Sequence, residues 1–227
     1  MYKYTGTENL EVMVDATNYN DFLVSIIEKE ITPNSIVVDF GAGIGTFAKK
    51  IKLLGHLVHC VESDSHQLNQ ILALDIPASL NLESFKNNSI DLIYSLNVLE
   101  HIENDTEIIN DFYNKVKPGG FILIYVPAFN ILYSSMDKTV GHVRRYTRSS
   151  LEEKVISSGF VVVRNDYVDS LGFFASLLFK LIGNDKGTIN RGALIFYDRF
   201  IFPLSRLFDI ICRKSFGKNV FLIARHP

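Results

Sequence analysis

The sequence predicts an α/β fold built around a mostly parallel sheet. Two continuous apolar runs, residues 36–40 and 121–126, have the composition of strands that are buried on both faces. Between such runs, apolar residues recur at helical spacing, for example over residues 22–31 and 108–116. A glycine-rich stretch, residues 41–45, directly follows the first run. Strands and helices therefore alternate along the chain, which is the order expected of a parallel sheet.

Composition limits the kind of protein. A chain of 227 residues with 47% hydrophobic and 21% charged residues suits one globular domain, residues 1–227. The net charge of −2 gives no basic excess to meet phosphates, so no nucleic acid is expected as a partner. Two cysteines, Cys60 and Cys212, make neither a disulfide framework nor a metal-ligand set. We therefore expect no bound metal and a reducing, cytoplasmic location.

The glycine-rich stretch after the first strand predicts a loop on which a ligand lies. Gly41, Gly43 and Gly45 tolerate positive φ and lack a Cβ, so the main chain can turn sharply and a ligand can approach it. The dinucleotide-binding fingerprint places its third glycine one residue later, where this chain has Thr46. A pyrophosphate ligand is therefore disfavoured. Asp39 ends the strand and could orient the loop or meet the ligand through water.

The second predicted strand ends in an acid. Residues 57–61 are mostly apolar and run into Glu62, about 20 residues after the glycines, where Rossmann-like sheets hold a ribose diol with a carboxylate. A glycine loop with such an acid indicates a nucleoside ligand. Residues 37–45 and 61–62 together resemble the first two motifs of the class I S-adenosylmethionine-dependent methyltransferases, of the type 11 and type 12 kind.

Two further stretches extend the resemblance. Residues 89–102 predict a strand (Leu92 to Tyr94) and a turn at 95–97, similar to the fourth-strand motif of the family. Residues 116–120, Val-Lys-Pro-Gly-Gly, correspond to the family's helix stop before its fifth strand. The resemblance implies S-adenosylmethionine as cofactor and S-adenosylhomocysteine as product. It implies cofactor contacts at Tyr19, Asp39, Gly41, Ala42, Gly43, Gly45, Glu62, Ser63, Ser95, Leu96 and Asn97.

The resemblance also implies the overall organisation. We expect a Rossmann-like, seven-stranded, mostly parallel sheet with helices on both faces and an antiparallel last strand. Residues 1–35 would cover the cofactor, residues 36–167 would form the core, residues 168–218 a helical insertion and residues 219–227 the final strand.

Residue patterns place the remaining elements in order. A helix should begin after a cap at 63–65, the third strand should lie near 78–82, and 104–106 should cap the next helix. Ser149 and Glu152 have the spacing of a capping box, which predicts a helix from that point. Strands are expected at 160–163 and 220–224.

The loop after the fifth strand carries the predicted acceptor site. Asp137, His142, Arg144, Arg145 and Tyr146 lie within eleven residues, and arginine pairs suit bidentate recognition of carboxylate or phosphate. This loop resembles a branch of the family, with a GHxRRY pattern, that is often seen among surface-glycan biosynthesis enzymes. The alternative is a solvated loop in which an arginine stacks on Tyr146.

Two histidines are candidates for a general base. His101 and His142 are both expected on loops at the ligand edge of the sheet, and histidine accepts a proton near neutral pH. His142 is favoured because Arg144 and Arg145 lie beside it. Alignment of the acceptor without a base is the alternative.

The region 170–213 is not needed by the sheet itself. Its longest apolar tract, residues 171–182, is broken by Lys180 and is too short to span a bilayer. Polar residues recur seven apart in its second half, which predicts a polar stripe along an apolar helix that Pro203 kinks. The stripe comprises Asp198, Ser205, Arg199, Arg206 and Arg213. A lid, a homodimer surface, a peripheral membrane contact and extra core packing all remain open.

The sequence thus predicts a methyltransferase that acts on a small-molecule or a glycan- or lipid-linked acceptor, by O-methylation. The arginine pair indicates an anionic acceptor, and the aromatic insertion indicates a lipid-attached one. The alternatives are a quinone or lipid methyltransferase, a nicotinamide-dependent oxidoreductase, and a catalytically silent protein that binds the cofactor.

Overall fold

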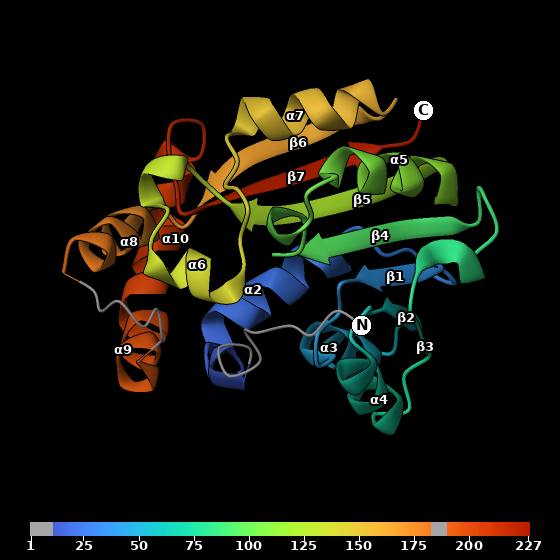
Figure 1. Ribbon diagram of the computed structural model, residues 1–227, viewed down its shortest axis with the longest axis horizontal. Coiled ribbons are helices and arrows are strands. Elements are labelled where there is room, and N and C mark those ends of the chain that lie inside the picture. The colour runs from blue at the N-terminus through green and yellow to red at the C-terminus, as the bar shows by residue number, and fades with distance from the viewer. Residues whose placement is uncertain (1–10, 183–189) are drawn as a thin grey trace.

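A seven-stranded sheet forms the centre of the computed structural model, which describes residues 11–182 and 190–227 (Figure 1). The strand order is β3-β2-β1-β4-β5-β7-β6. All neighbours up to β5 pair in parallel, and β7 lies antiparallel between β5 and β6, so the predicted topology is confirmed. The strands are β1 (Val37–Phe40), β2 (Val58–Val61), β3 (Ala78–Ser79), β4 (Ile90–Leu96), β5 (Val116–Pro127), β6 (Val161–Val168) and β7 (Asn219–Arg225).

The order of the strands reverses at β1. The chain adds β2 and β3 on one side of β1 and then returns to place β4 on the other side. Connections from β1 and β4 therefore leave in opposite directions and open a crevice beyond their carboxyl ends, which is where open α/β sheets bind ligands. The glycine loop follows β1, and the turn at Asn97 follows β4.

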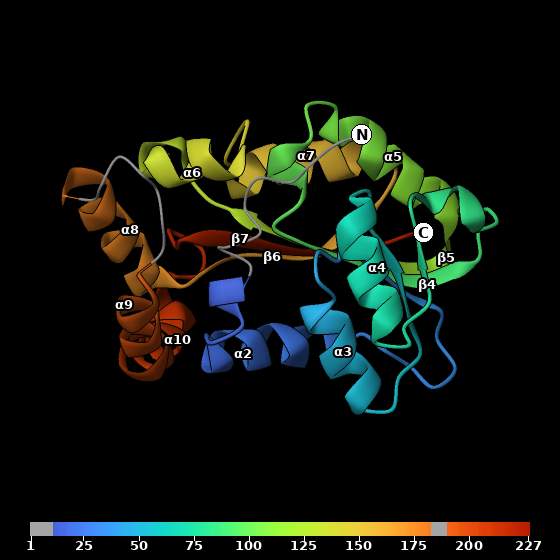
Figure 2. The ribbon, with the colours of Figure 1, turned by 60° about the horizontal axis from the view of Figure 1, so that its bottom comes forward.

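Helices cover both faces of the sheet (Figures 1 and 2). In the two views, α2, α3 and α4 lie on one face, and α5 and α7 lie on the other. The α-helices are α2 (Thr17–Glu28), α3 (Thr46–Leu53), α4 (Ser65–Ala73), α5 (Asp105–Lys115), α6 (Ser135–Val140), α7 (Arg148–Ser157), α8 (Ser170–Ile182), α9 (Arg191–Phe196) and α10 (Phe202–Cys212). Short helical turns are η1 (Leu82–Ser84), η2 (Leu99–His101), η3 (Asn130–Leu132) and the π-helical η4 (Tyr197–Ile201).

Each face of the sheet has its own hydrophobic core. Side chains alternate along a strand, so Ile122 and Ile124 of β5 pack with Phe112 of α5, whereas Leu123 and Tyr125 face the opposite core. That second core holds the apolar sides of α2, α3 and α4. Burial on both faces explains why the strand reads as one continuous apolar run.

The helical insertion is oriented by buried carboxylates. Asp198 accepts hydrogen bonds from the backbone N–H groups of Asn18 (3.0 Å) and Tyr19 (2.8 Å) at the start of α2. Asp209 does the same for Asp169 (3.0 Å) and Ser170 (2.8 Å) at the start of α8. Residues distant in sequence thus cap both helices. Of the predicted polar stripe, Asp198 and Ser205 face the protein interior, whereas Arg199 and Arg213 are exposed.

Several local expectations are corrected. The capping box consists of Thr147 and Ser150, not of Ser149 and Glu152, so α7 begins two residues earlier than that pair would place it. Glu152 instead accepts a hydrogen bond from Asn165 (2.8 Å). Asn104 stands at the N-cap position of α5 without a side-chain capping bond.

Other elements lie close to where the sequence places them. The cap of α4 is Asp64, whose Oδ1 accepts from the backbone of His66 at 2.8 Å. The third strand is only Ala78–Ser79, within the expected range. Residues 95 and 96 belong to β4, so the turn begins at Asn97, where φ is 55°. Pro203 stands in the first turn of α10, directly after the π-helical turn.

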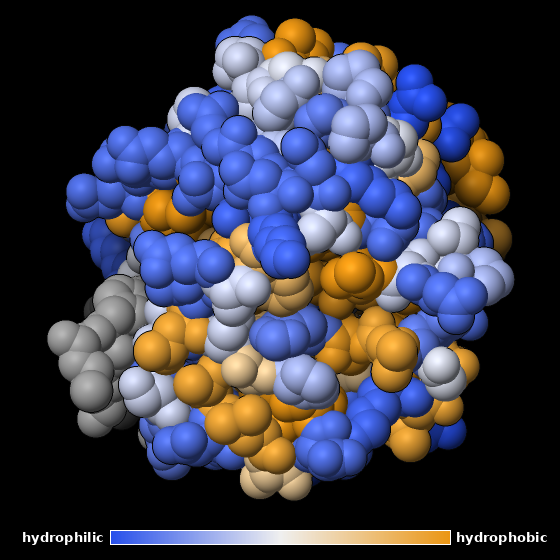
Figure 3. Space-filling view, turned by 90° about the vertical axis from the view of Figure 1, so that its right-hand side faces the viewer, coloured by the Kyte–Doolittle hydropathy of each residue, from blue (hydrophilic) through white to orange (hydrophobic). Residues whose placement is uncertain are grey.

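The two ends of the molecule differ. At one end, hydrophobic side chains gather in the lower half of the view in Figure 3, over α3 and α4, and include the exposed Leu53 and Leu57. The opposite end consists of α8, α9 and α10 (Figure 2). No helix within residues 11–182 and 190–227 is long and apolar enough to cross a membrane.

Replacing Asp198 should destabilise the fold, because the partly buried first N–H groups of α2 would lose their acceptor. We expect Asp198→Ala to lower the free energy of unfolding by about 1–3 kcal/mol. Urea denaturation measures this change. The matched control is Asp21→Ala, also on α2, which removes an exposed ion pair with Lys50 of α3. It should shift stability by less than about 0.5 kcal/mol. Equal effects of the two substitutions would contradict the capping role.

Candidate active site

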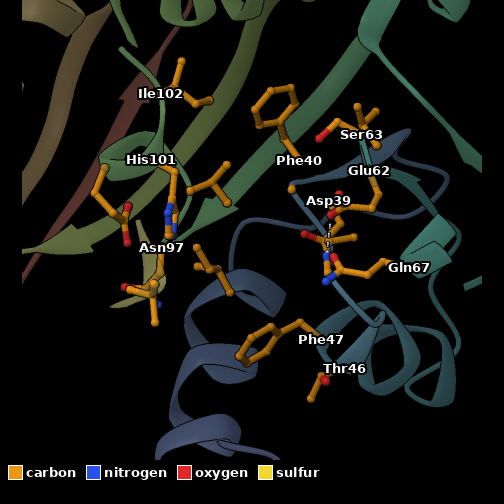
Figure 4. Close-up of a pocket in the computed structure, with 18 of the residues that line it drawn as sticks. Asp39, Phe40, Thr46, Phe47, Glu62, Ser63, Gln67, Asn97, His101 and Ile102 are labelled. Atoms are coloured by element: carbon orange, nitrogen blue, oxygen red, sulfur yellow. Dashed lines mark hydrogen bonds between the residues drawn. The ribbon is translucent and has the colours of Figure 1, made fainter. Parts of the chain in front are cut away.

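A cavity of about 690 Å³ opens at the carboxyl ends of β1 and β4. One wall is formed by the glycine loop and the end of β2, with Asp39, Glu62 and Gln67. The other wall includes Asn97 and His101 (Figure 4). Met13 and Tyr19, from the N-terminal segment, also line it, and the cavity extends to Lys218 before β7. Predicted strand ends, N-terminal segment and histidines thus meet around one space.

The glycine loop has the conformation that its sequence requires. The φ angles of Gly41, Gly43 and Gly45 are 76°, 57° and 79°, in the left-handed region that side chains disfavour. A Cβ on Gly41 would lie 2.4 Å from Cγ2 of Val98, so no side chain fits between this loop and the turn after β4. The main chain of the loop therefore stands directly on the cavity wall.

Glu62 holds the loop from the neighbouring strand. Its Oε2 accepts from the backbone N–H of Gly43 (2.8 Å), and its Oε1 accepts from that of Asp64 (2.8 Å). Burial raises the pKa of the Glu62 carboxyl, while these two N–H donors act in the opposite direction. The carboxylate lies at the edge of the cavity, where it can meet a ligand as well as the loop.

Asp39 is almost fully buried at the base of the same wall, with 3% of its surface exposed. Burial raises its pKa to about 7, although the nearby Tyr94 hydroxyl favours the charged form. The Oδ2 atom of Asp39 has no hydrogen-bond partner of standard geometry within the described part of the chain. A buried acceptor of this kind can bind a cationic or N–H-bearing ligand group.

The structure separates the predicted cofactor residues into two sets. Tyr19 and most of the predicted loop, strand-end and turn residues line the cavity; Ser95 does not. Ser95 is 1% exposed within β4, so its interpretation as a contact residue is corrected. Cavity-lining residues that the sequence analysis missed include Gln67, Asn81 and Lys218, which no local motif marks. The predicted cofactor residues that do line the cavity are Tyr19, Asp39, Gly41, Ala42, Gly43, Glu62, Ser63, Leu96 and Asn97. Gly45 is the N-cap of α3.

Two of the predicted acceptor residues stabilise the fold instead. Tyr146 is 1% exposed, and its hydroxyl donates to Asp105 at 2.6 Å. Arg144 forms an ion pair with the same carboxylate, with Nη1 and Oδ2 2.9 Å apart, and Lys154 approaches it from α7 at 2.8 Å. These partners outweigh burial and lower the pKa of Asp105. Neither Arg144 nor Tyr146 lines the cavity, so the structure does not support the expectation that they bind the acceptor.

Asp137 connects the remaining two members of this loop. The guanidinium of Arg145 donates from Nε (2.9 Å) and Nη2 (3.0 Å) to the two oxygens of Asp137, and Nη1 donates to the carbonyl of Ala128. The Nδ1 atom of His142 lies 2.6 Å from Oδ1 of Asp137. Although Asp137 is buried, the bonds from His142 and Arg145 hold the pKa of its carboxyl well below the usual range. All three nitrogens of the Arg145 guanidinium thus donate within the protein, whereas only Nδ1 of His142 contacts Asp137.

His142 presents its other ring nitrogen toward the cavity among buried titratable groups. Nε2 lies 3.7 Å from Oε1 of Glu100, and the rings of His101 and His142 are 4.6 Å apart. Burial raises the pKa of Glu100 to about 8, so this carboxyl is mostly protonated at neutral pH. Burial, together with His142, lowers the pKa of His101 to about 4. The ligand atoms of Glu100, His101 and His142 lie within 4.8 Å of one another, which is close enough to share a metal ion.

A comparison with protein families assigns the part of the chain that forms most of the sheet and of the cavity. A profile described as a methyltransferase domain matches residues 16–165. The chain belongs to this methyltransferase family. The match covers the glycine loop, Glu62, the β4 turn and the loop of His142, so the resemblance to class I S-adenosylmethionine-dependent methyltransferases is confirmed. S-adenosylmethionine is therefore the methyl donor against which the residues of the cavity can be compared.

Individual relatives of this methyltransferase are distant. Phosphoethanolamine N-methyltransferase 2 of Caenorhabditis elegans is 27% identical over 143 aligned residues, which cover 54% of this chain and 32% of that protein. The chain thus spans about a third of the length of this curated relative.

Solved structures share the fold. The phosphoethanolamine N-methyltransferase 2 of Haemonchus contortus, in complex with S-adenosyl-L-methionine, has a TM-score of 0.63 and 18% identity, covering 91% of this chain and 52% of that one. A SAM-dependent methyltransferase from Archaeoglobus fulgidus has a TM-score of 0.61 and 16% identity, covering 91% and 94%.

The residues of the methyltransferase fit this cofactor. The glycine loop leaves bare main chain at the position where an adenosyl group would lie, and Glu62 stands one strand away for its ribose hydroxyls. The orphaned Oδ2 of Asp39 suits the positively charged amino-acid end of the cofactor. These three features lie along one wall of the cavity.

Glu62→Ala should weaken binding of S-adenosylmethionine and S-adenosylhomocysteine equally, because a ribose contact is the same in both. The loss of a charge-assisted hydrogen bond predicts a roughly 10- to 100-fold higher Kd for each compound. Isothermal titration calorimetry measures both constants. Glu83→Ala, which removes an exposed carboxylate on η1, is the control and should change neither. An unchanged Kd for Glu62→Ala would show that the ribose lies elsewhere.

Asp39 should make stability depend on pH. Its folded pKa of about 7 lies above that of an unfolded aspartate, near 4, so the folded state holds the extra proton between these values. Stability contributed by this proton is complete below about pH 4 and is lost as the pH rises to 7. Between pH 5 and pH 8, the free energy of unfolding should fall by roughly 2 kcal/mol less in Asp39→Asn than in the unsubstituted protein, measured without cofactor. Parallel pH curves for the two proteins would refute this assignment; exposed Asp75→Asn serves as control.

Proposed function

We propose that this methyltransferase methylates a hydroxyl group of a small acceptor, with His142 as the general base. The observation that supports the proposal is the contact between His142 Nδ1 and Asp137 Oδ1, 2.6 Å apart on the cavity side of α6. A carboxylate whose pKa is strongly lowered accepts hydrogen bonds only, so Nδ1 carries the proton and Nε2 holds the lone pair. The tautomer that can take a proton from an acceptor is thus fixed.

The surroundings keep that nitrogen available. Glu100, the nearest carboxyl to Nε2, is mostly protonated at neutral pH and therefore supplies little charge to pair with a protonated His142. His101 stands beside it with a lowered pKa, so its ring is neutral near pH 7. Both groups place His142 in a largely desolvated position, which strengthens the interaction with a hydroxyl.

The reaction requires little else from the protein. When bound, S-adenosylmethionine supplies a methyl group on a positively charged sulfur. The sulfur leaves as a neutral thioether, so the leaving group needs no proton from the protein. The chain has to align the acceptor oxygen, exclude water and receive the hydroxyl proton at Nε2 of His142. The acceptor side of the cavity is lined by the buried Pro127 and Val140 and the half-buried Ile102, which limit access of water.

Lys218 supports an anionic acceptor. Since Arg145 is committed to Asp137 and Arg144 lies outside the cavity, Lys218 is the lining cation that a carboxylate or phosphate could meet. Apolar residues such as Met136 and Ile108 line the same space and suit a partly hydrophobic acceptor. A sugar acid, a phosphorylated sugar, a glycan precursor and a lipid-linked form of these all combine the two properties.

N-methylation of a phosphorylated amine is the second candidate. It is favoured by the 27% identity to a phosphoethanolamine N-methyltransferase, together with Lys218 as a phosphate partner. The two candidates can be distinguished by incubating the protein with methyl-deuterated S-adenosylmethionine and pools of hydroxyl and amine acceptors. Mass spectrometry of the product shows whether oxygen or nitrogen carries the label, and a labelled nitrogen would refute O-methylation.

Replacing His142 should slow the reaction without weakening cofactor binding. We expect His142→Ala to reduce kcat about 10²-fold or more on a hydroxyl acceptor, because the proton then has no base. The Kd for S-adenosylmethionine should stay within about twofold, since the glycine loop and Glu62 are unaffected. The exposed His66→Ala on α4 is the matched control. Unchanged turnover in His142→Ala would remove this histidine from the mechanism.

A further inference from the structure

The helical insertion exposes the face that a globular helix normally buries. Along η4 and α10, the residues packed against the protein include Asp198, Ser205 and Asp209, with 3%, 0% and 5% of their surfaces exposed. Ser205 donates to Asp169 (2.8 Å) and accepts from the backbone of Leu171 (2.9 Å). These bonds fix the rotation of the helix about its axis, so its other side must face outward.

That outward side is strongly apolar. Ile210 is 70% exposed, Ile211 83% and Leu207 62%. Large apolar side chains spaced three or four residues apart line the exposed side from α9 to the end of α10, and further ones lie on the adjacent α8. These residues, which we call the apolar end face, are Phe174, Leu178, Leu181, Ile195, Phe196, Phe200, Leu204, Leu207, Phe208, Ile210 and Ile211.

The charges around the apolar end face are basic. Residues 170–218 contain eight Lys or Arg and three Asp, a formal charge of +5 in a chain whose total is −2. Of the acidic residues that the structure describes there, Asp198 and Asp209 are both buried, whereas Lys180, Arg199 and Arg213 are exposed. Arg199 lies against Phe200, 5.7 Å from its ring centre, so a charged group borders the apolar surface directly.

We propose that the apolar end face binds the surface of a bilayer with anionic headgroups, with α9 and α10 lying in the interface. Helices that bind in this way combine a large apolar face with flanking Lys and Arg, as found here. The interior bonds of Asp198 and Asp209 leave one face for lipid, so the helix lies on the bilayer rather than entering it. The proposal does not depend on which atom the enzyme methylates.

Charge argues against a second copy of the chain as the occupant. A symmetric dimer through this face would place the same basic side chains of both copies opposite one another. Such an interface repels itself, whereas lipid phosphates would neutralise Arg199 and Arg213. Figure 2 shows α8, α9 and α10 together at one end of the molecule, away from α3 and α4, so a bilayer could approach this end without contact with the rest.

Vesicle binding of the full chain tests the proposal. We expect the protein to sediment with vesicles that mix phosphatidylglycerol and phosphatidylcholine, and to bind phosphatidylcholine vesicles at least roughly tenfold more weakly. Leu207→Glu with Ile211→Glu should reduce binding roughly tenfold or more, because two exposed anchors become anionic. Arg199→Gln with Arg213→Gln should also reduce it roughly tenfold or more, on anionic vesicles only.

A matched control lies at the opposite end of the molecule. Leu53 and Leu57 are 77% and 83% exposed on and after α3, so Leu53→Glu with Leu57→Glu adds the same charges at comparable exposure. This variant should bind the vesicles as the unsubstituted protein does. Equal loss in both double variants, or no binding by the unsubstituted protein, would overturn the proposal. A dimer in analytical ultracentrifugation that only Leu207→Glu with Ile211→Glu dissolves, without vesicle binding, would also overturn it and assign the face to a second copy.

A fluorescent reporter locates the contact. The chain contains no tryptophan, so Leu207→Trp supplies a single fluorophore on the apolar end face, and Leu57→Trp supplies one at the other end. Anionic vesicles should shift the emission of the first variant to shorter wavelength and leave that of the second unchanged. A shift in the second variant alone would place the contact at the α3 end and refute the proposal.

Discussion

The turn after β1 is the constraint on which the arrangement of the site depends. Gly41 leaves the strand with positive φ, and its Cα hydrogen side packs so tightly against Val98 that even one additional carbon would overlap. This contact brings the carboxyl ends of β1 and β4 together across the point where the strand order reverses. The main chain of the glycine loop is then directly exposed to the cavity. The position of Glu62, whose carboxylate holds Gly43 in place, follows from the same turn.

Electrostatic environment divides the carboxyl groups around the cavity into two kinds. Asp137 is buried but receives hydrogen bonds from Arg145 and His142, so it stays ionised. Asp39 and Glu100 are buried with few donors, and their pKa values rise to about 7 and about 8. One carboxylate therefore stays charged and holds the ring of His142, while the other two are close to neutral until a ligand brings a compensating charge. The difference lies in hydrogen-bond partners and not in residue type.

The sequence alone predicts those features of the fold and the site that neighbouring residues in the chain determine. The glycines at 41, 43 and 45 require a particular backbone, and the continuous apolar run at 121–126 requires burial on two faces, so both could be placed without coordinates. Glu62 could be placed because its spacing from the loop is set by one helix and one strand. The seven-stranded, mostly parallel sheet and the antiparallel β7 followed from the family resemblance.

Features whose cause is a distant partner could not be predicted in this way. Arg144 and Tyr146 were interpreted as acceptor contacts because nothing in their neighbourhood reveals that Asp105, on α5, binds both. The seven-residue spacing of Asp198 and Ser205 correctly indicated one polar side of a helix, but only the position of α2 and α8 shows that this side faces inward. Lys218 enters the cavity through the folding of β7 beside β5, which no local pattern reports.

The link between Asp198 and the start of α2 joins two segments that a smaller version of this fold could lack. Tyr19, whose N–H is one of the capped groups, and the next residue, Asn20, form part of the cavity wall. Asp198 of the insertion thus supports a wall that its own side chain does not line. A shortened enzyme without residues 168–218 would lose the acceptor for those N–H groups. Evolution or design would therefore have to gain, lose or exchange the two segments as a pair.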